Sequence, residues 1–282
     1  MNKENQFNVA EIKNYLKKQD YDLKQFKLNI FSEVDSTNDC AKEFIESKLN
    51  SFSEAELQQS PFVFAAEKQL KGRGRRGHTW FSNNSAGLAV SFLYKVEIDL
   101  ARLPQITAAA GLAVQELLKE ISLPAQIKWP NDLIVNQRKI SGILTELVFN
   151  DQQEAYVIIG CGVNLNNKNF NAEVSRTATS FYQEKNKAIS KSIFLARLLI
   201  KMNLYIKKYF SHQRESLIKV WKKELNLTDK KVRINYKNDN YLVIIKKVLD
   251  NGDLWVRFKH GQEKILKTAN TSLDYSSLVE FN

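Results

Sequence analysis

The alternation of hydrophobic and polar positions divides the chain into a long part of mixed helices and strands and a short part of strands alone. Apolar residues at helical spacing predict helices, and short apolar or alternating runs between turn residues predict strands. The clearest buried helix covers residues 103–121, which are rich in alanine and leucine. The other predicted helices cover residues 7–25, 36–49, 190–211 and 214–225, and the predicted strands cover residues 28–34, 61–66, 86–96, 127–135, 140–149 and 155–165.

The pattern changes after Asn226, where short strand-like runs follow one another between turns. Several short strands at close and regular spacing are typical of a small barrel. We therefore predict an α/β domain over residues 1–227, with a short helical extension at residues 1–27, and a barrel over residues 228–282. The strands predicted for the barrel cover residues 232–236, 241–248, 254–259 and 263–266.

Composition and cysteine content indicate the cellular compartment of the protein. A chain of 282 residues, 43% hydrophobic and 26% charged, is an ordinary globular protein with room for one large core and a small extra domain. Its best apolar run, residues 108–118, is interrupted by Gln115 and Glu116, so we expect no membrane span. The N-terminus lacks a secretory pattern, and Cys40 and Cys161 are lone thiols without metal-ligand spacing. These features predict a cytoplasmic protein.

The net charge of +11 has two interpretations. It could mark a protein that binds nucleic acid. Alternatively, the charge is spread over solvated helix faces, because lysines occur throughout the chain and only residues 72–77 concentrate arginine. We favour the second interpretation.

The run Gly-Arg-Gly-Arg-Arg-Gly at residues 72–77, here called the arginine loop, is the most informative segment. Glycines allow positive φ and a close approach to a ligand, and clustered arginines need anions when they are buried. The run matches a dinucleotide-binding fingerprint in letters only, because no apolar helix follows it. A solvated surface loop is the alternative, so this segment alone leaves a phosphate or carboxylate ligand as a hypothesis.

A second polar segment has the sequence Lys-Trp-Pro-Asn-Asp at residues 128–132. Pro130 restricts the residue before it to extended geometry and cannot donate to a sheet, so the segment should lie at a strand end or a bulge. Lys139 begins the next strand, and a hairpin would bring Lys128 and Lys139 together. A hairpin with two solvated lysines is the alternative.

Together these segments resemble the biotin protein ligase family. Asp35-Ser36-Thr37-Asn38 after a strand resembles the first biotin-contacting segment, and the arginine loop with Gln69 resembles the loop that ligand orders. Residues 128–132 and 138–146 resemble the catalytic hairpin, and residues 159–164 resemble the strand that closes the pocket. The order and spacing agree over residues 30–165.

The resemblance implies a synthetase-like (class II) catalytic domain, built on a central mixed β-sheet flanked by helices, and an SH3-like C-terminal barrel. It also implies an ATP- and Mg²⁺-dependent enzyme that forms biotinyl-5′-AMP and transfers biotin to a lysine of the biotin carboxyl carrier protein of acetyl-CoA carboxylase. We expect a monomer or a weak homodimer. The resemblance also implies residue roles. The implied catalytic residues are Lys139, Arg75 and Lys128, and Asp132 is a candidate Mg²⁺ ligand. The implied biotin contacts are Ser36, Thr37, Asn38, Gln69, Gly72, Arg73, Gly74, Arg75, Lys139, Gly142 and Gly160. The implied nucleotide contacts are Arg73, Arg75, Arg76, Trp80, Lys128, Asn131 and Asn164.

The chain departs from the family pattern in two places. Only 34 residues precede Asp35, too few for the winged helix-turn-helix of bifunctional members, so we expect no DNA-binding repressor activity. Near the C-terminus the family often has a Ser-Leu-Arg run, and here residues 271–274 read Thr-Ser-Leu-Asp. Two other functions remain open: a lipoate-type protein ligase or acyltransferase, and a basic nucleic-acid-binding protein.

Overall fold

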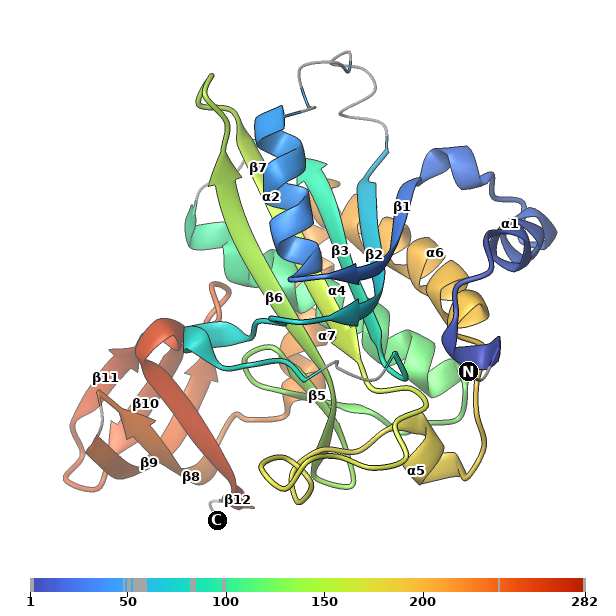
Figure 1. Cartoon of the computed structure of the whole chain (residues 1–282). Coiled ribbons are helices and arrows are strands. Elements are labelled where there is room, and N and C mark those ends of the chain that lie inside the picture. Colours follow the sequence, from blue (N-terminus) through green and yellow to red (C-terminus); the bar gives the residue numbers. More distant parts are fainter. Residues whose placement is uncertain are drawn as a thin grey trace.

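A seven-stranded mixed β-sheet forms the centre of the larger part of the molecule (Figure 1). This computed structural model describes residues 3–47, 49, 52, 60–81, 85–97, 100–237 and 239–280. The strand order is β1-β2-β3-β7-β6-β5-β4, with β1 and β2 parallel and every other pair antiparallel. The predicted mixed sheet is confirmed. The strands are β1 (Lys27–Val34), β2 (Phe62–Gln69), β3 (Leu88–Lys95), β4 (Gln126–Lys128), β5 (Asp132–Val135), β6 (Arg138–Phe149) and β7 (Ala155–Val163).

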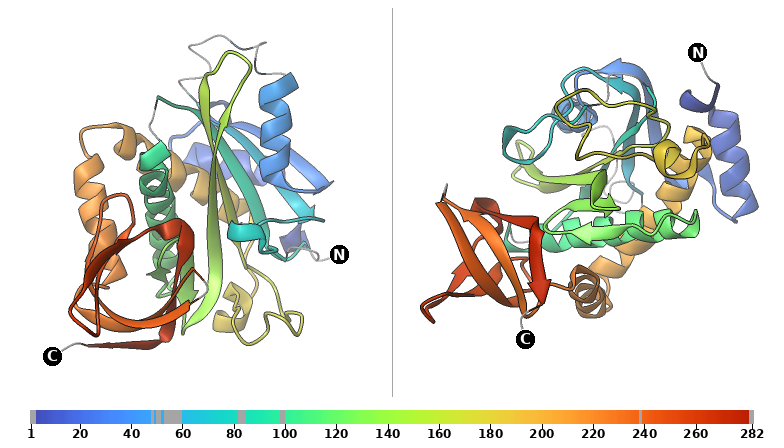
Figure 2. Two further views of the ribbon diagram at one scale, coloured as in Figure 1. Left: turned by 90° about the vertical axis from the view of Figure 1, so that its left-hand side faces the viewer. Right: turned by 90° about the horizontal axis from the view of Figure 1, so that it is seen from below.

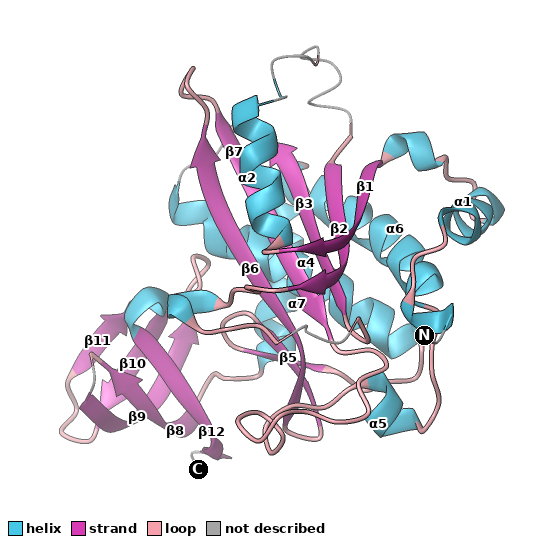
Figure 3. Ribbon diagram, viewed as in Figure 1, coloured by secondary structure: helices cyan, strands magenta, loops and turns pink. Residues whose placement is uncertain are grey.

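Helices cover both faces of this sheet (Figure 3). On β2, Phe62 and Phe64 pack with α2 (Thr37–Ser47), whereas Val63 and Ala65 belong to the cluster that includes α4 (Leu103–Glu120) and α6 (Lys191–Phe210). Successive side chains of a strand point to opposite faces, so a continuous apolar run is buried on both sides. The predicted helix over residues 103–121 is α4, and between residues 106 and 118 all of it is buried except Thr107 and Glu116, which are half-buried.

Other helices differ from their predicted ranges mainly at the ends. α6 and α7 (Arg214–Leu225) follow the prediction closely. The first helix, α1 (Val9–Lys18), is shorter than expected, because the chain turns at Asp20, which has a φ of 60°. The end of α2 at Ser47 precedes residue 48, which lies outside the described residues. The short helix α5 (Phe181–Lys185) was not predicted. Within the described residues, no helix combines the length and the apolar character that crossing a bilayer requires.

The prediction of one strand over residues 127–135 is wrong. The chain forms β4, turns at residues 129–131 and returns antiparallel as β5, so that Lys128 pairs with Asp132. The turn contains a cis peptide bond between Trp129 and Pro130. Pro130 has no N–H for a ladder, which is the physical reason that the strand breaks there.

The C-terminal part is a five-stranded antiparallel sheet that curls strongly on itself (Figure 2). Its order is β11-β10-β9-β8-β12. The four predicted strands are present, and the last strand, β12, was missed because polar residues interrupt its apolar pattern. A short 3₁₀ turn, η6 (Thr268–Asn270), precedes it. The strands are β8 (Lys230–Tyr236), β9 (Asp239–Val248), β10 (Leu254–Phe258), β11 (Glu263–Leu266) and β12 (Thr271–Glu280).

The curled sheet and the larger part share a hydrophobic core. Interior residues of the curled sheet, such as Val232 and Leu254, belong to the same cluster as α4 and α6. The indole Nε1 of Trp129 donates to the carbonyl of Gly252 over 2.8 Å, and the backbone N–H of Trp129 donates to the Tyr275 hydroxyl over 2.6 Å. The predicted boundary at residue 227 stays a prediction, since apolar contacts continue across it.

Lys191 is a buried cation at the start of α6, and sequence patterning gave no sign of it. It is 0% exposed, and its Nζ donates to the carbonyls of Glu67 and Ser85 while lying 4.6 Å from the Phe7 ring centre. Burial lowers the pKa of Lys191 to about 8, against a smaller opposing effect of the Glu67 carboxylate. The charged form therefore destabilises the fold.

We expect the free energy of unfolding to rise with pH, relative to a Lys191→Met variant, between about pH 8 and pH 10.5. In that range the unfolded chain binds the Lys191 proton and the folded chain does not, so raising the pH favours folding by up to roughly 3 kcal/mol. Urea unfolding at several pH values measures this. Lys219→Met, at an exposed position, is the control and should track the wild type. A pH-independent difference between wild type and Lys191→Met would contradict the assignment.

Candidate ligand-binding site

The floor of the site is a patch of the central sheet that carries almost no side chains. On the face covered by α2, Ala89 of β3 pairs with Gly162 of β7, which pairs in turn with Gly142 of β6. In the next row Gly160 lies between Ser91 and Leu144. Beyond the first turn of α2 this face is therefore hollow, because its residues are too small to fill the space.

Two side chains lie directly over these glycines. A Cβ on Gly162 would collide with the ring of Trp80, and a Cβ on Gly160 would collide with the amide of Asn38. A Cβ on Gly142 would meet Lys139 Nζ at 3.2 Å and Asp132 Oδ1 at 3.3 Å. These glycines serve close approach rather than a special backbone conformation.

The arginine loop forms the roof as a small hairpin. Arg73 and Thr79 form an isolated β-bridge, and the Trp80 N–H donates to the Gly72 carbonyl over 2.9 Å. Positive φ values occur at Gly77 (76°) and at Arg76 (55°), but not at Gly72 or Gly74. Gly72 is required instead because a Cβ there would collide with the Trp80 carbonyl.

One end of the site is lined with neutral hydrogen-bonding groups. The Thr37 N–H and hydroxyl both donate to Gln69 Oε1, over 2.8 and 3.1 Å. The hydroxyl of Ser91, which was not predicted, donates to Asn38 Oδ1 over 2.5 Å and lies 2.7 Å from the Thr37 hydroxyl. Ser36 accepts at its carbonyl from the first N–H groups of α2. All of these residues are buried, so this network is rigidly held.

Glu146 of β6 anchors this end from below, and sequence reasoning gave it no role. Its Oε2 accepts from Asn38 Nδ2 over 2.6 Å, its Oε1 pairs with Lys42 at 2.8 Å, and Arg73 lies 3.5 Å away. Burial alone would raise the pKa of Glu146, but hydrogen bonds from Lys42 and Asn38 outweigh it and hold the pKa below its usual value. Arg73 pairs more closely with Asp39, at 2.5 Å. Its charge is therefore largely balanced.

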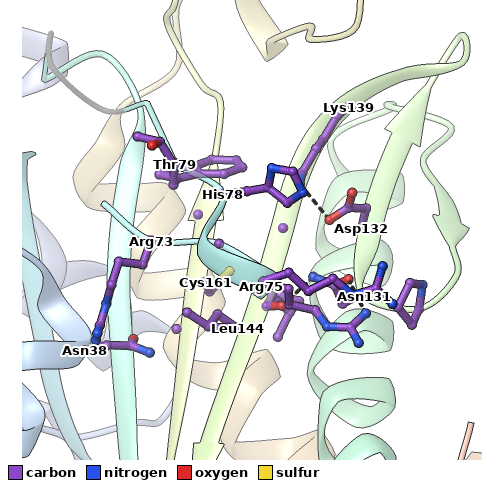
Figure 4. Close-up of a pocket in the computed structure, with 18 of the residues that line it drawn as sticks. Asn38, Arg73, Arg75, His78, Thr79, Asn131, Asp132, Lys139, Leu144 and Cys161 are labelled. Atoms are coloured by element: carbon purple, nitrogen blue, oxygen red, sulfur yellow. Dashed lines mark hydrogen bonds and ion pairs between the residues drawn. The ribbon is translucent and has the colours of Figure 1, made fainter. Parts of the chain in front are cut away.

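The opposite end gathers cations around Asp132 (Figure 4). Lys139 Nζ forms an ion pair with Asp132 Oδ1 at 2.7 Å and lies 5.5 Å from the Trp80 ring centre. Lys128 Nζ lies 5.2 Å from the Tyr275 ring centre. The two lysines come from β4 and β6, on either side of β5, so the predicted proximity arises from three strands rather than from one hairpin.

Arg75 and Arg76 are held differently, by neutral oxygens. Arg75 donates to Asn131 Oδ1 over 3.3 Å and to the Thr268 carbonyl over 3.2 Å. Arg76 donates to the carbonyls of Thr268 and Thr271 over 3.0 and 2.9 Å. Burial, and then the neighbouring charge of Arg76, lower the pKa of Arg75. Where the chain is described, neither guanidinium has a carboxylate in an ion pair, so both remain suited to binding an anion.

These groups enclose a cavity of about 310 Å³ between the sheet, the arginine loop and the start of β12. Gly72 and Asn164 are the predicted residues that do not line it. Gly72 supports Trp80, and Asn164 donates to the carbonyls of Thr179 and Lys139. The predicted residues on the lining are Ser36, Thr37, Asn38, Gln69, Arg73, Gly74, Arg75, Arg76, Trp80, Lys128, Asn131, Asp132, Lys139, Gly142 and Gly160.

Several residues on the lining were missed. They include His78 and Thr79 of the roof, Leu144 and Gly162 of the floor, and residues 271–273 of β12. Glycine in a strand is a signal that could have identified Gly162; the others carry no local signal. Cys161, interpreted from sequence as a core residue, is buried and also borders the cavity, and burial raises the pKa of its thiol to about 12.

A family model and individual relatives of known function both match this chain. Residues 33–164 match the model of the biotin/lipoate A/B protein ligase family. The chain is 29% identical over 206 residues to the bifunctional ligase/repressor BirA of Bacillus subtilis, covering 72% of this chain and 63% of that protein. It is 32% identical over 108 residues to a biotin–[acetyl-CoA-carboxylase] ligase of Mycobacterium tuberculosis, covering 36% of this chain and 39% of that protein. The chain thus spans less than two thirds of these relatives.

A solved structure matches over more of the chain. The biotin protein ligase of Aquifex aeolicus, in complex with biotin and ATP, superposes with a TM-score of 0.71 at 26% identity. The match covers 88% of this chain and 98% of that one, so it extends well beyond residues 33–164.

Glu146→Gln should destabilise the protein by about 1 kcal/mol at neutral pH, through loss of charged hydrogen bonds to Lys42 and Asn38. Because the folded pKa of Glu146 is lowered from 4.5, its contribution is complete above that value and disappears as the pH falls through the folded pKa. Urea unfolding at pH 3–7 measures the difference between variant and wild type. Glu33→Gln, which breaks an exposed pair with Lys68, is the matched control. A difference that persisted undiminished at the lowest pH would refute this role.

Proposed function

Because residues 33–164 of this chain match the model of the biotin/lipoate A/B protein ligase family, we propose that the protein belongs to it and is an ATP-dependent biotin–protein ligase. A biotin carboxylate oxygen attacks the α-phosphorus of ATP, the bond to the bridging oxygen breaks, and pyrophosphate leaves. The amine of an acceptor lysine then attacks the carbonyl carbon of biotinyl-5′-AMP, loses a proton, and AMP leaves. The observation that carries the proposal is one cavity with a neutral polar end and a cationic end.

The neutral end suits the ureido ring of biotin, which offers one carbonyl and two N–H groups in a mainly apolar body. Thr37, Asn38 and Gln69 supply hydroxyl and amide groups at the edge of the hollow floor. Leaving a buried ureido group unpaired would cost about 1–3 kcal/mol, so this network selects the ligand. Glu146 fixes the orientation of the Asn38 amide.

The cationic end suits the reaction between a carboxylate and a phosphate. Two anions must approach each other, so fixed positive charge is needed to offset their repulsion and to stabilise the transition state. Lys139, Arg75 and Lys128 supply that charge from three different elements. Lys139 is the main electrophilic group, because its Nζ lies beside both the Trp80 ring and Gly142 of the floor.

Mg²⁺ would enter with the nucleotide. Asp132 is the acidic residue on the described lining, and one of its oxygens is already paired with Lys139. A magnesium ion commonly uses one or two carboxylates together with substrate phosphates, so a single Asp132 oxygen fits such a site. Its charge would add to that of the arginines and lysines.

The nucleotide base has a candidate position on the far side of Trp80. A second small cavity, of about 100 Å³, is lined by Trp80, Lys139, Asn164 and Phe170 among others. Stacking of an adenine on Trp80 would contribute about 1–3 kcal/mol. Asn164 would act by holding the backbone of Lys139 and Thr179, since its amide is engaged there.

The acceptor is proposed by analogy with the mycobacterial relative, whose name specifies acetyl-CoA carboxylase. We therefore propose a biotin carboxyl carrier domain as the protein substrate. We also propose that the enzyme is a monomer or a weak homodimer. Cys40 and Cys161 are both free thiols, which supports a cytoplasmic location. Arg76 brings a guanidinium to the first residue of β12, near the place where the family run has its own arginine.

Pyrophosphate exchange with a panel of carboxylic acids tests the function. The purified chain should catalyse ATP–pyrophosphate exchange with biotin and at least about 100-fold less with lipoate, since the neutral end is matched to a ureido group. Lys139→Ala should abolish exchange, and Lys168→Ala, whose side chain does not line the main cavity, should not change it. Exchange that depended on lipoate alone would support the lipoate-type ligase instead. Near-normal exchange by Lys139→Ala would remove Lys139 from its role.

Arg75→Gly should impair retention of the adenylate more than its synthesis. Without this guanidinium the anhydride would leave the cavity and acylate lysines of other proteins. The measurement is biotin incorporation into a bystander protein, such as albumin, compared at equal rates of pyrophosphate release. Arg197→Ala, which removes an ion pair with Glu120 away from the cavity, is the control. Unchanged labelling of the bystander would contradict this role for Arg75.

A further inference from the structure

The two arginines that lack a carboxylate partner are anchored on one backbone carbonyl of the curled sheet. Arg75 and Arg76 both donate to the Thr268 oxygen, over 3.2 and 3.0 Å. Thr268 begins the turn η6 and is 8% exposed. This carbonyl is therefore the one anchor that both guanidinium groups share, besides Asn131 for Arg75 and the Thr271 carbonyl for Arg76.

Thr268 is itself fixed by Asp253, a buried carboxylate in the turn before β10. Asp253 Oδ1 accepts from the Thr268 N–H over 3.0 Å and from its hydroxyl over 2.9 Å. The other oxygen, Oδ2, accepts from Lys267 Nζ over 2.8 Å and from Asn251 Nδ2 over 3.0 Å. Asp253 is 5% exposed, so these four donors balance a charge that would otherwise be costly to bury.

The separation of Asp253 from the arginines has a chemical purpose. A carboxylate in direct contact would neutralise a guanidinium and would compete with a phosphate for it. A carbonyl orients the guanidinium but leaves its charge available. Asp253 does not line the main cavity, and it reaches the arginines only through the peptide of Thr268.

We propose that Asp253 is a positioning residue for nucleotide binding, which acts through Thr268 on Arg75 and Arg76. This inference rests on the proposed function and adds to it a role for the curled sheet. The curled sheet then contributes to nucleotide binding, since it orients the guanidinium groups of Arg75 and Arg76 that bind the phosphates. The indole of Trp129, held by Gly252 of the same turn, links the residue 128–132 segment to this arrangement.

A double-mutant cycle tests this role. Asp253→Ala should lower kcat/KM for ATP about tenfold, because Arg75 and Arg76 are then no longer aligned to meet the phosphates. In an Arg75→Ala/Arg76→Ala background the same change should have less than about a twofold effect. Affinity for a non-hydrolysable ATP analogue, measured by calorimetry, gives the same comparison without catalysis. A tenfold effect of Asp253→Ala that persisted in the background lacking both arginines would overturn the proposal.

Two further variants separate positioning from folding. Asp253→Asn keeps an oxygen that accepts from Thr268 and should restore most of the affinity. Asp250→Asn changes an exposed carboxylate of the same turn, which pairs with Lys222, and should match the wild type. If Asp253→Ala fails to fold, Thr268→Val removes one of the two donors to Asp253 and should weaken nucleotide binding about threefold. An affinity unchanged in Thr268→Val would then overturn the proposal.

Different results would refute the proposed function and the positioning role of Asp253. A wild-type chain without biotin-dependent exchange refutes the ligase assignment, whereas the nucleotide titrations still decide the role of Asp253. A wild type that is active, together with an Asp253→Ala variant of unchanged nucleotide affinity, refutes only the positioning role.

Discussion

The site depends on the removal of side chains from the middle of a β-sheet. Gly142 of β6 lies in cross-strand register with Gly162 of β7, and Gly160 lies two residues before Gly162 on the same face of β7, so at these three positions no side chain stands between the sheet and the groups above it. Glycine weakens a strand, so the flanking rows carry the packing that offsets this cost. Tyr156 and Ile158, on the same face of β7, are fully buried beneath α2. The sheet is therefore dense at one end and hollow at the other.

The polarity of the cavity follows from how each charged group is balanced. Arg73 is balanced by Asp39 and lies close to Glu146, and it belongs to the neutral end, whereas Arg75 and Arg76 rest on carbonyl oxygens and remain electrostatically open. Adjacent arginines of one loop thus have different environments. The difference is set by elements that are distant in sequence: α2 and β6 on one side, and the turn before β12 on the other.

Sequence patterning identified the elements that have one dominant period. The helix over residues 103–121 and the two helices after residue 190 are examples, since their apolar residues repeat at helical spacing. It failed at residues 127–135, where a proline turn divides an apolar run, and at β12, whose polar residues alternate irregularly. The arginine loop was recognisable because three arginines and three glycines within six residues are unusual, and Lys139 was identified through the resemblance of residues 138–146 to a family motif. Glu146, Ser91 and Asp253 were not, since each gains its role from partners more than about a dozen residues away.

The glycine floor limits how ligand preference can be altered. Every substitution at Gly142, Gly160 or Gly162 adds atoms, so variation on this side can make the cavity shallower and never deeper. Room for a bulkier acid has to come from the margins, for instance from Leu144, which adjoins Gly160 and has a side chain that can be shortened. Attempts to retarget the protein by directed evolution should therefore accumulate changes around the rim and leave the three glycines untouched.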